Sequence, residues 1–125
     1  MLQNLAYIAQ RQKDYERARS LFAEGLRNSQ EPKDRLSVAN CLLGLAGILV
    51  IKGQPHRAAG IFGTAEAVRE TIGAHIQPGD RPDYEANLAL LRSRLDASTF
   101  EAFWNAGRAM PLEQVVASTL QFEDS

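Results

Sequence analysis

The chain has 125 residues, a length that fits one domain and buries roughly two-thirds of its unfolded surface on folding. Its 14 Lys and Arg residues nearly balance its 15 Asp and Glu residues, so no broad positive field for nucleic acid is expected. The single cysteine, Cys41, lies in an apolar run, which favours a buried thiol in a reducing compartment. No targeting pattern is visible, and we expect a cytoplasmic chain with no membrane partner.

Two helices are predicted in the first third of the chain. Apolar residues at helical spacing indicate one helix from Met1 to about Gln12. Asp14 can cap a second helix whose inner stripe includes Phe22 and Leu26. The first pattern already runs at residue 1 without a capping residue, which is typical of a fragment of a longer protein; the alternative is that Met1 is the true start.

The central stretch is Ser37 to Ile51, SVANCLLGLAGILVI. At about 100° per residue its apolar side chains point in nearly every direction, so this helix must be buried on all sides. It is too short to span a bilayer, which needs roughly 20 residues. Gly53 is placed to end the helix in the left-handed conformation, and Pro55 to begin the next one with Gln54 as a weak cap. This pattern predicts a tight helical hairpin.

The fourth helix is expected to bury a stripe from Ala58 to Ile72 and to turn Arg69 outward. The stretch from Gly73 to Asp80 is the longest irregular one and the expected mobile loop. Three helices follow, the sixth beginning near Asp96 or at Ser98, where Ser98 and Glu101 match a capping box. The expected inner positions are Tyr84, Leu88, Leu91 and Leu95 in the fifth helix, Phe100, Phe103, Trp104 and Gly107 in the sixth, and, after Pro111, Leu112, Val115, Val116 and Leu120 in the seventh.

The first two hairpins repeat. An offset of 40 residues carries Leu5-Ala6 onto Leu45-Ala46, Ala18 onto Ala58 and Phe22 onto Phe62. These positions resemble the leucine–small pair, the small residue and the aromatic residue of the tetratricopeptide (TPR) repeat. The chain departs from that motif because Ala9 or Leu49 occupies the tyrosine position and the repeat is longer than about 34 residues.

No strand pattern appears, so the predicted fold class is all-α. The TPR resemblance implies a right-handed superhelix of antiparallel helical hairpins with about seven helices in a single domain, residues 1–125. The hairpins are expected at about 1–29, 32–72 and 81–109, and a C-terminal capping helix at 111–122 is expected to cover the last hairpin.

A further set of residues begins near Gly53. It comprises Arg57-Ala58-Ala59, Gly63, Ala65-Glu66, Arg69-Glu70, Gly73, Pro82, Tyr84-Glu85, Phe100, Trp104, Gly107-Arg108, Met110 and Leu112-Glu113. This set resembles the C-terminal TPR-like region of large bacterial signal-transducing NTPase regulators, such as LuxR-type and related transcriptional activators. In these regulators a DNA-binding or catalytic effector domain and an NTPase precede a helical repeat sensor. Pro111 departs from that pattern, since relatives tend to carry a Ser or Thr cap there.

The resemblance implies binding rather than chemistry. A protein partner, or upstream domains of the same chain, is expected along the concave groove formed by the first helix of each hairpin. The repeat alignment places in this groove Gln3, Tyr7, Gln10, Arg11, Leu43, Gly47 and Val50. This lining is polar in the first repeat and apolar in the second, and no polar element caps the first helix. We therefore expect the isolated fragment to self-associate as a two-fold dimer through its first hairpin or the neighbouring groove.

The alternative function is a small-molecule effector sensor. Its pocket is expected between the fifth and sixth helices and the loop that starts at Gly73, with Tyr84, Trp104 and Arg108 as lining residues. The stripe that contains Trp104 is more typical of core than of a pocket, and Arg108 is expected to hold nearby carbonyls or acids.

No enzyme, metal site or cofactor is predicted. His56 and His75 lack metal-ligand spacing. Glu66 and Glu70, with Arg69 beside them, are interpreted as a solvated charge pair rather than a general acid and base. We expect no direct nucleic-acid contact, since the sequence lacks a phosphate loop and an exposed basic clamp.

Overall fold

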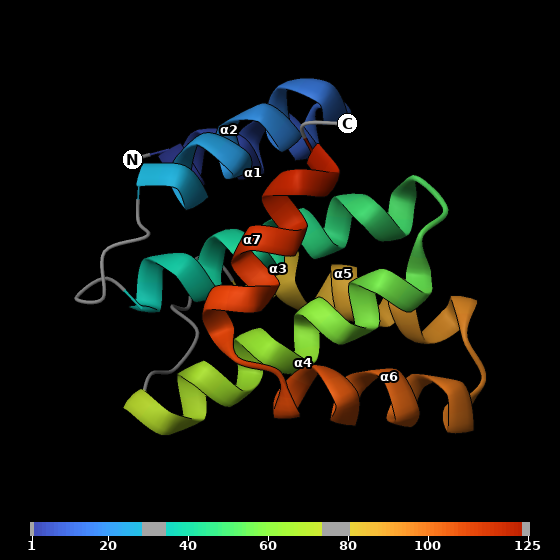
Figure 1. The fold of residues 1–125 in the computed structure, drawn as a ribbon. Coiled ribbons are helices and arrows are strands. Elements are labelled where there is room, and N and C mark those ends of the chain that lie inside the picture. Colours follow the sequence, from blue (N-terminus) through green and yellow to red (C-terminus); the bar gives the residue numbers. More distant parts are fainter. Residues whose placement is uncertain (1, 29–34, 74–80, 124–125) are drawn as a thin grey trace.

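The computed structural model describes residues 2–28, 35–73 and 81–123. These residues form seven α-helices and contain no strand (Figure 1), which confirms the predicted all-α class. The helices are α1 (Leu2–Arg11), α2 (Tyr15–Asn28), α3 (Arg35–Ile51), α4 (Pro55–Ile72), α5 (Arg81–Arg94), α6 (Ala97–Ala109) and α7 (Leu112–Glu123). The expected mobile loop, including His75, lies outside the described residues except for Gly73.

Helix α3 is the centre of the fold. Every residue from Cys41 to Val50 is buried, and α3 contacts α1, α2, α4 and α5. A helix that is apolar on all sides can be accommodated only where other helices surround it. The predicted central helix and its buried thiol are therefore confirmed.

The turns of the first two hairpins share one backbone conformation. Gly53 has a φ of 86°, and Lys13, 40 positions earlier, has a φ of 64°. The amides of Asp14 and Gln54 each donate to the carbonyl five residues earlier, at 2.9 and 2.8 Å. Asp14 also accepts a hydrogen bond from the Arg17 amide, whereas Gln54 makes no side-chain capping bond. The repeat detected in the sequence is thus a repeat of backbone geometry.

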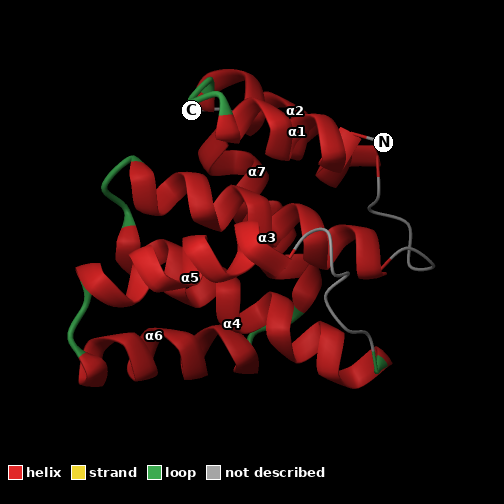
Figure 2. Ribbon diagram, turned by 180° about the vertical axis from the view of Figure 1, so that it is seen from behind, coloured by secondary structure: helices red, strands yellow, loops and turns green. Residues whose placement is uncertain are grey.

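Helices α5 and α6 pack on different helices of the second hairpin. Helix α5 lies along α3 and α6 lies along α4, while α5 and α6 meet mainly at their connecting turn (Figures 1 and 2). This corrects the expected hairpin at 81–109, in which the two helices were to pack on each other. The physical reason is the close fit of α4 against α6, which glycines on both helices permit.

Two glycines, Gly63 and Gly107, allow this close fit. A Cβ atom on Gly63 would lie 2.1 Å from the Trp104 carbonyl oxygen, and a Cβ on Gly107 would lie 1.9 Å from the Gly60 carbonyl oxygen. Both distances are far below van der Waals contact, so no larger residue fits there without moving a helix.

We expect Gly107→Ala to lower the free energy of unfolding by about 1–3 kcal/mol, because the added methyl group overlaps the α4 backbone. Gly60→Ala is the matched control. Its Cβ would meet only the Phe103 carbonyl oxygen at 3.7 Å, and alanine favours a helix interior over glycine by up to about 1 kcal/mol. This control variant should be as stable as the wild type or more stable. Denaturant titration measures the free energy of unfolding of both variants. Equal losses would contradict the proposal that the contact between Gly107 and the α4 backbone requires a glycine.

Helix α7 crosses the second helices of the first two hairpins. It contacts α2 and α4, and it lies on the side of the α3–α4 pair opposite α5 (Figures 1 and 2). Val115, Val116 and Thr119 are buried there, and Arg35 of α3 forms an ion pair with Glu113 at 3.7 Å. The C-terminal helix therefore covers apolar surface, but that surface belongs to α2 and α4 rather than to the predicted last hairpin. The apolar face of α7 predicts that this side of the helix is buried, but it does not predict which helices cover it.

Helix α6 begins at the first of its two predicted starts. The Asp96 carboxylate accepts a hydrogen bond from the Thr99 amide at 2.9 Å. Hydrogen bonding from the Thr99 side chain first, and then from the Thr99 amide, holds the pKa of Asp96 below its usual value. The alternative capping box is not used, and both Ser98 and Glu101 are exposed.

Three burial predictions were wrong. Ile72 and Phe103 were expected inside, yet 42% and 41% of their surfaces are exposed. Ile72 is the last residue of α4, and Phe103 packs edge-on against His56 at the surface, with ring centroids 5.1 Å apart. Arg69 was expected outside but is only 7% exposed, since its charge is compensated by a neighbouring carboxylate.

Candidate functional site

The predicted partner groove is closed in the second hairpin. Leu43, Gly47 and Val50 are buried, because α5 covers this face of α3. Asn87 of α5 takes the space that Gly47 leaves, and a Cβ on Gly47 would lie 2.3 Å from the Asn87 amide nitrogen. These three residues belong to the core in this structure, which corrects their prediction as an open binding surface.

The groove residues of the first hairpin lie on α1. Gln10 is half-buried, and its Nε2 donates a hydrogen bond to Asn87 Oδ1 at 2.8 Å, which joins α1 to α5. Arg11 is exposed. The side chains of Gln3 and Tyr7 lie outside the described part of the structure.

Among the α1 side chains that the structure describes, two apolar ones are exposed. Leu5 is 46% exposed and Ile8 is 45% exposed, whereas Ala9 is buried against the rest of the fold. Residues three apart on a helix are neighbours, so Leu5 and Ile8 share one apolar face. We call this pair the α1 face.

Two of the predicted effector-pocket residues, Tyr84 and Trp104, pack against the ring of a buried phenylalanine. Tyr84 packs edge-on against Phe62, and Trp104 stacks on the same ring, with centroid distances of 6.0 and 6.3 Å. Trp104 also stacks on Phe100 at 5.2 Å. The core interpretation of Trp104 therefore describes its surroundings better than the pocket interpretation.

A partly buried ionic cluster joins α4 to α5. Glu66 Oε1 accepts hydrogen bonds from Arg69 Nη1 at 2.5 Å and from the Tyr84 hydroxyl at 3.0 Å. Burial first, and then the Glu66 charge, raises the pKa of Tyr84 above its usual value. The predicted solvated pair is thus in part a buried contact, and its hydrogen bonds compensate for the desolvated charges.

Arg108 forms a second ion pair at the surface. Its Nη1 and Nη2 donate to the two carboxylate oxygens of Glu70 at 2.5 and 3.1 Å. This contact holds the pKa of Glu70 below its usual value. Arg108 therefore binds an acid, as predicted, and joins α6 to α4.

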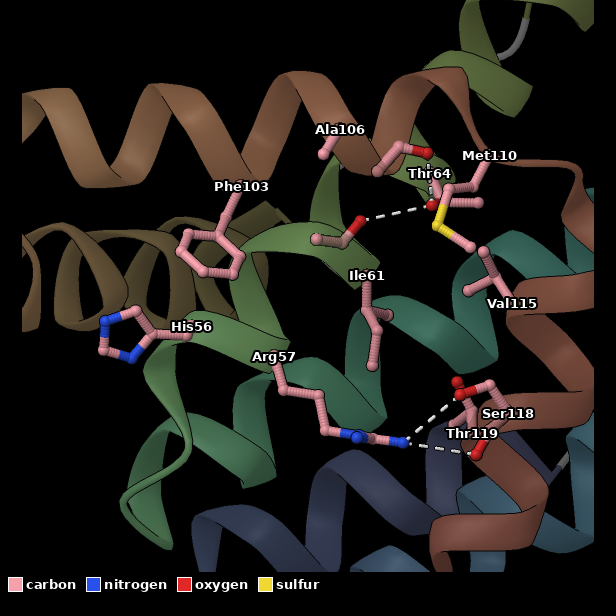
Figure 3. Close-up of a pocket in the computed structure, with 12 residues that line it drawn as sticks. His56, Arg57, Ile61, Thr64, Phe103, Ala106, Met110, Val115, Ser118 and Thr119 are labelled. Carbon is pink, nitrogen blue, oxygen red and sulfur yellow. Dashed lines mark hydrogen bonds between the residues drawn. The ribbon is translucent and has the colours of Figure 1, made fainter.

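A cavity of about 310 Å³ lies between α4, α6 and α7 (Figure 3). Its walls include the apolar side chains of Ile61, Phe103, Met110 and Val115. Arg57 lies at the α7 side, where its Nη2 donates to the Ser118 carbonyl at 3.3 Å and to the Ser118 hydroxyl at 3.4 Å. Sequence reasoning missed this cavity because it depends on how three helices meet.

No group of three or more His, Cys, Asp or Glu residues in the described part of the chain could hold a metal ion. Among the same residues, no helix is both long and apolar enough to cross a membrane.

Paired helices that repeat with the same turn geometry define a helical repeat protein. Residues 1–71, more than half of the chain, match the tetratricopeptide repeat family. The chain therefore belongs to the tetratricopeptide repeat family. Comparisons with curated proteins and with solved structures found no match. TPR repeats generally mediate protein–protein interactions, and the family typically serves as a non-catalytic scaffold.

Proposed function

We propose that this chain is a non-catalytic interaction and sensor domain of a larger cytoplasmic bacterial regulator. Membership of the TPR family supports the interaction role. The residues from Gly53 onward that resemble the C-terminal region of NTPase regulators such as LuxR-type activators support the regulatory role. In this proposal the domain binds a protein partner or upstream domains of its own chain and has no direct nucleic-acid contact.

The α1 face is the observation on which this proposal rests. The second hairpin cannot offer its groove, because α5 covers it, whereas Leu5 and Ile8 stay exposed. Repeat proteins bury the apolar face of one repeat against a neighbouring one. In a longer regulator, upstream repeats would cover the α1 face. In the isolated chain, a second copy takes their place in a two-fold dimer.

We expect the isolated chain to dimerise at micromolar concentration and Ile8→Glu to weaken the dimer by at least about tenfold. A two-fold contact buries each apolar side chain twice, and burying the exposed part of Ile8, a little under half of its surface, contributes about 1 kcal/mol each time. Sedimentation velocity gives the dissociation constant, and Leu5→Glu should act in the same direction.

Ile72→Glu is the matched control for this experiment. Ile72 is exposed to a similar extent but lies at the end of α4, so its substitution should leave the dimer intact. A wild-type chain that is monomeric across this concentration range would contradict the dimer, as would equal effects of the two isoleucine substitutions.

A second candidate function, small-molecule sensing, is favoured by the cavity between α4, α6 and α7.

A further inference from the structure

We propose that the cavity between α4, α6 and α7 binds a small amphipathic carboxylate. The apolar body of the ligand would fill the cavity, and its carboxylate would pair with Arg57. This proposal does not depend on the α1 face or on partner binding.

The size and walls of the cavity fit such a ligand. Small-molecule pockets have volumes of about 300–1,000 Å³, and the observed cavity has about 310 Å³. At about 30 Å³ per water molecule this volume corresponds to roughly ten non-hydrogen atoms. Ile61 and Val115 are buried in the walls, and Phe103 and Met110 are exposed apolar residues of the same lining. An apolar ligand would cover them and gain from their burial.

The charges around the cavity favour an anion. The twelve lining residues, all in the described part of the chain, include Arg57 and His56 but no aspartate or glutamate. Arg57 reaches Ser118 at 3.3 and 3.4 Å, which is longer than the usual N–H···O distance. A carboxylate accepts shorter, charge-assisted and often bidentate hydrogen bonds from a guanidinium. It would therefore be a better acceptor for Arg57 Nη2 than the Ser118 oxygens.

The cavity is held by a preformed framework. The Thr64 hydroxyl donates to the Gly107 carbonyl at 2.6 Å and thereby joins α4 to α6 (Figure 3). The close backbone contacts of Gly63 and Gly107 join the same two helices. Because the walls are already in place, binding requires little loss of conformational entropy in the protein.

Octanoate is the probe for the test, because it has ten non-hydrogen atoms and one carboxylate, about what the volume admits. The comparison probes are 1-octanol, which has the same chain without charge, and octylammonium, which has the opposite charge. Isothermal titration calorimetry on the whole chain should show that octanoate binds at least about tenfold more tightly than either, as expected for a charged hydrogen bond. Amide resonances around the cavity should shift on titration. Equal binding of the three probes, or shifts confined to other surfaces, would overturn the proposal.

Two variants locate the binding within the cavity. Arg57→Gln should lower octanoate affinity by about tenfold or more and change 1-octanol affinity by less than about twofold. Arg19→Gln, at a site outside the cavity lining, is the matched control and should leave both affinities unchanged. Ala106→Phe fills the cavity from an exposed position on α6, so it should fold normally and abolish octanoate binding. Circular dichroism verifies folding, and a folded Ala106→Phe chain that still binds octanoate would overturn the proposal.

Discussion

Replacement of Phe62 by alanine will lower the free energy of unfolding by about 3–5 kcal/mol, the usual cost of removing a buried phenylalanine. Phe62 is fully buried on α4. Its ring packs against Tyr84 of α5 and Trp104 of α6, so one cavity would loosen three helices. Equilibrium urea titration followed by circular dichroism measures the change.

Phe103→Ala is the matched control for this substitution. It removes the same side chain from α6, but that ring is 41% exposed, and surface substitutions usually change stability by about 0.5 kcal/mol or less. We expect a loss below about 1 kcal/mol. Similar losses for the two variants would show that the Phe62 ring is not the contact that joins α4, α5 and α6.

Leu45→Ala will lower the free energy of unfolding by about 2–5 kcal/mol. Leu45 has no exposed surface and lies in the middle of α3, the helix that contacts α1, α2, α4 and α5. The cavity left by the substitution is surrounded by packed helices, which limits the relaxation that could fill it. The same urea titration reports the loss.

Leu5→Ala provides the comparison, since Leu5 occupies the equivalent position of the first repeat but is 46% exposed. Its substitution should cost the monomer less than Leu45→Ala does, because about half of this side chain is exposed and less buried area is lost. A loss below about 0.5 kcal/mol for Leu45→Ala would mean that α3 is not surrounded as the structure describes.

Local patterns in the sequence were sufficient to predict the helices and the first two hairpins. The apolar run of α3 required burial on all sides, and Gly53 followed by Pro55 encodes a stop and a start within three residues. The offset of 40 residues was visible in the sequence because the repeats share side chains at equivalent packing positions. These features depend on residues close to one another in the chain.

The arrangement of the last three helices depends on contacts that local patterns do not encode. Gly63 and Gly107 belong to the set of residues that resembles bacterial NTPase regulators. Their physical role becomes visible only where α6 meets α4. Arg69 looks like a surface residue on a helical wheel, and its burial requires Glu66 and Tyr84. Periodicity identifies which face of a helix is buried but not its partner, and for this reason α5 and α7 were misplaced.

The binding sites were less predictable than the fold. The repeat alignment assigned Gly47 and Val50 to a groove by analogy with other repeats, whereas α5 fills that space in this chain. The alternative pocket was expected between the fifth and sixth helices and the loop that starts at Gly73, whereas the cavity beside Arg57 lies between α4, α6 and α7. Arg57 was not predicted as a site residue, since its proximity to Ser118 requires α7 to fold back.

We expect the path of α7 to influence how the domain unfolds. In a simple repeat array each repeat contacts only its neighbours, so the ends can open one repeat at a time. Here the last helix contacts α2 of the first hairpin as well as α4, so the two ends of the chain support each other. Opening of α2 removes part of the surface that holds α7, and the reverse is also true. Amide hydrogens in these two helices should therefore exchange with solvent as one cooperative unit rather than as two independently fraying ends.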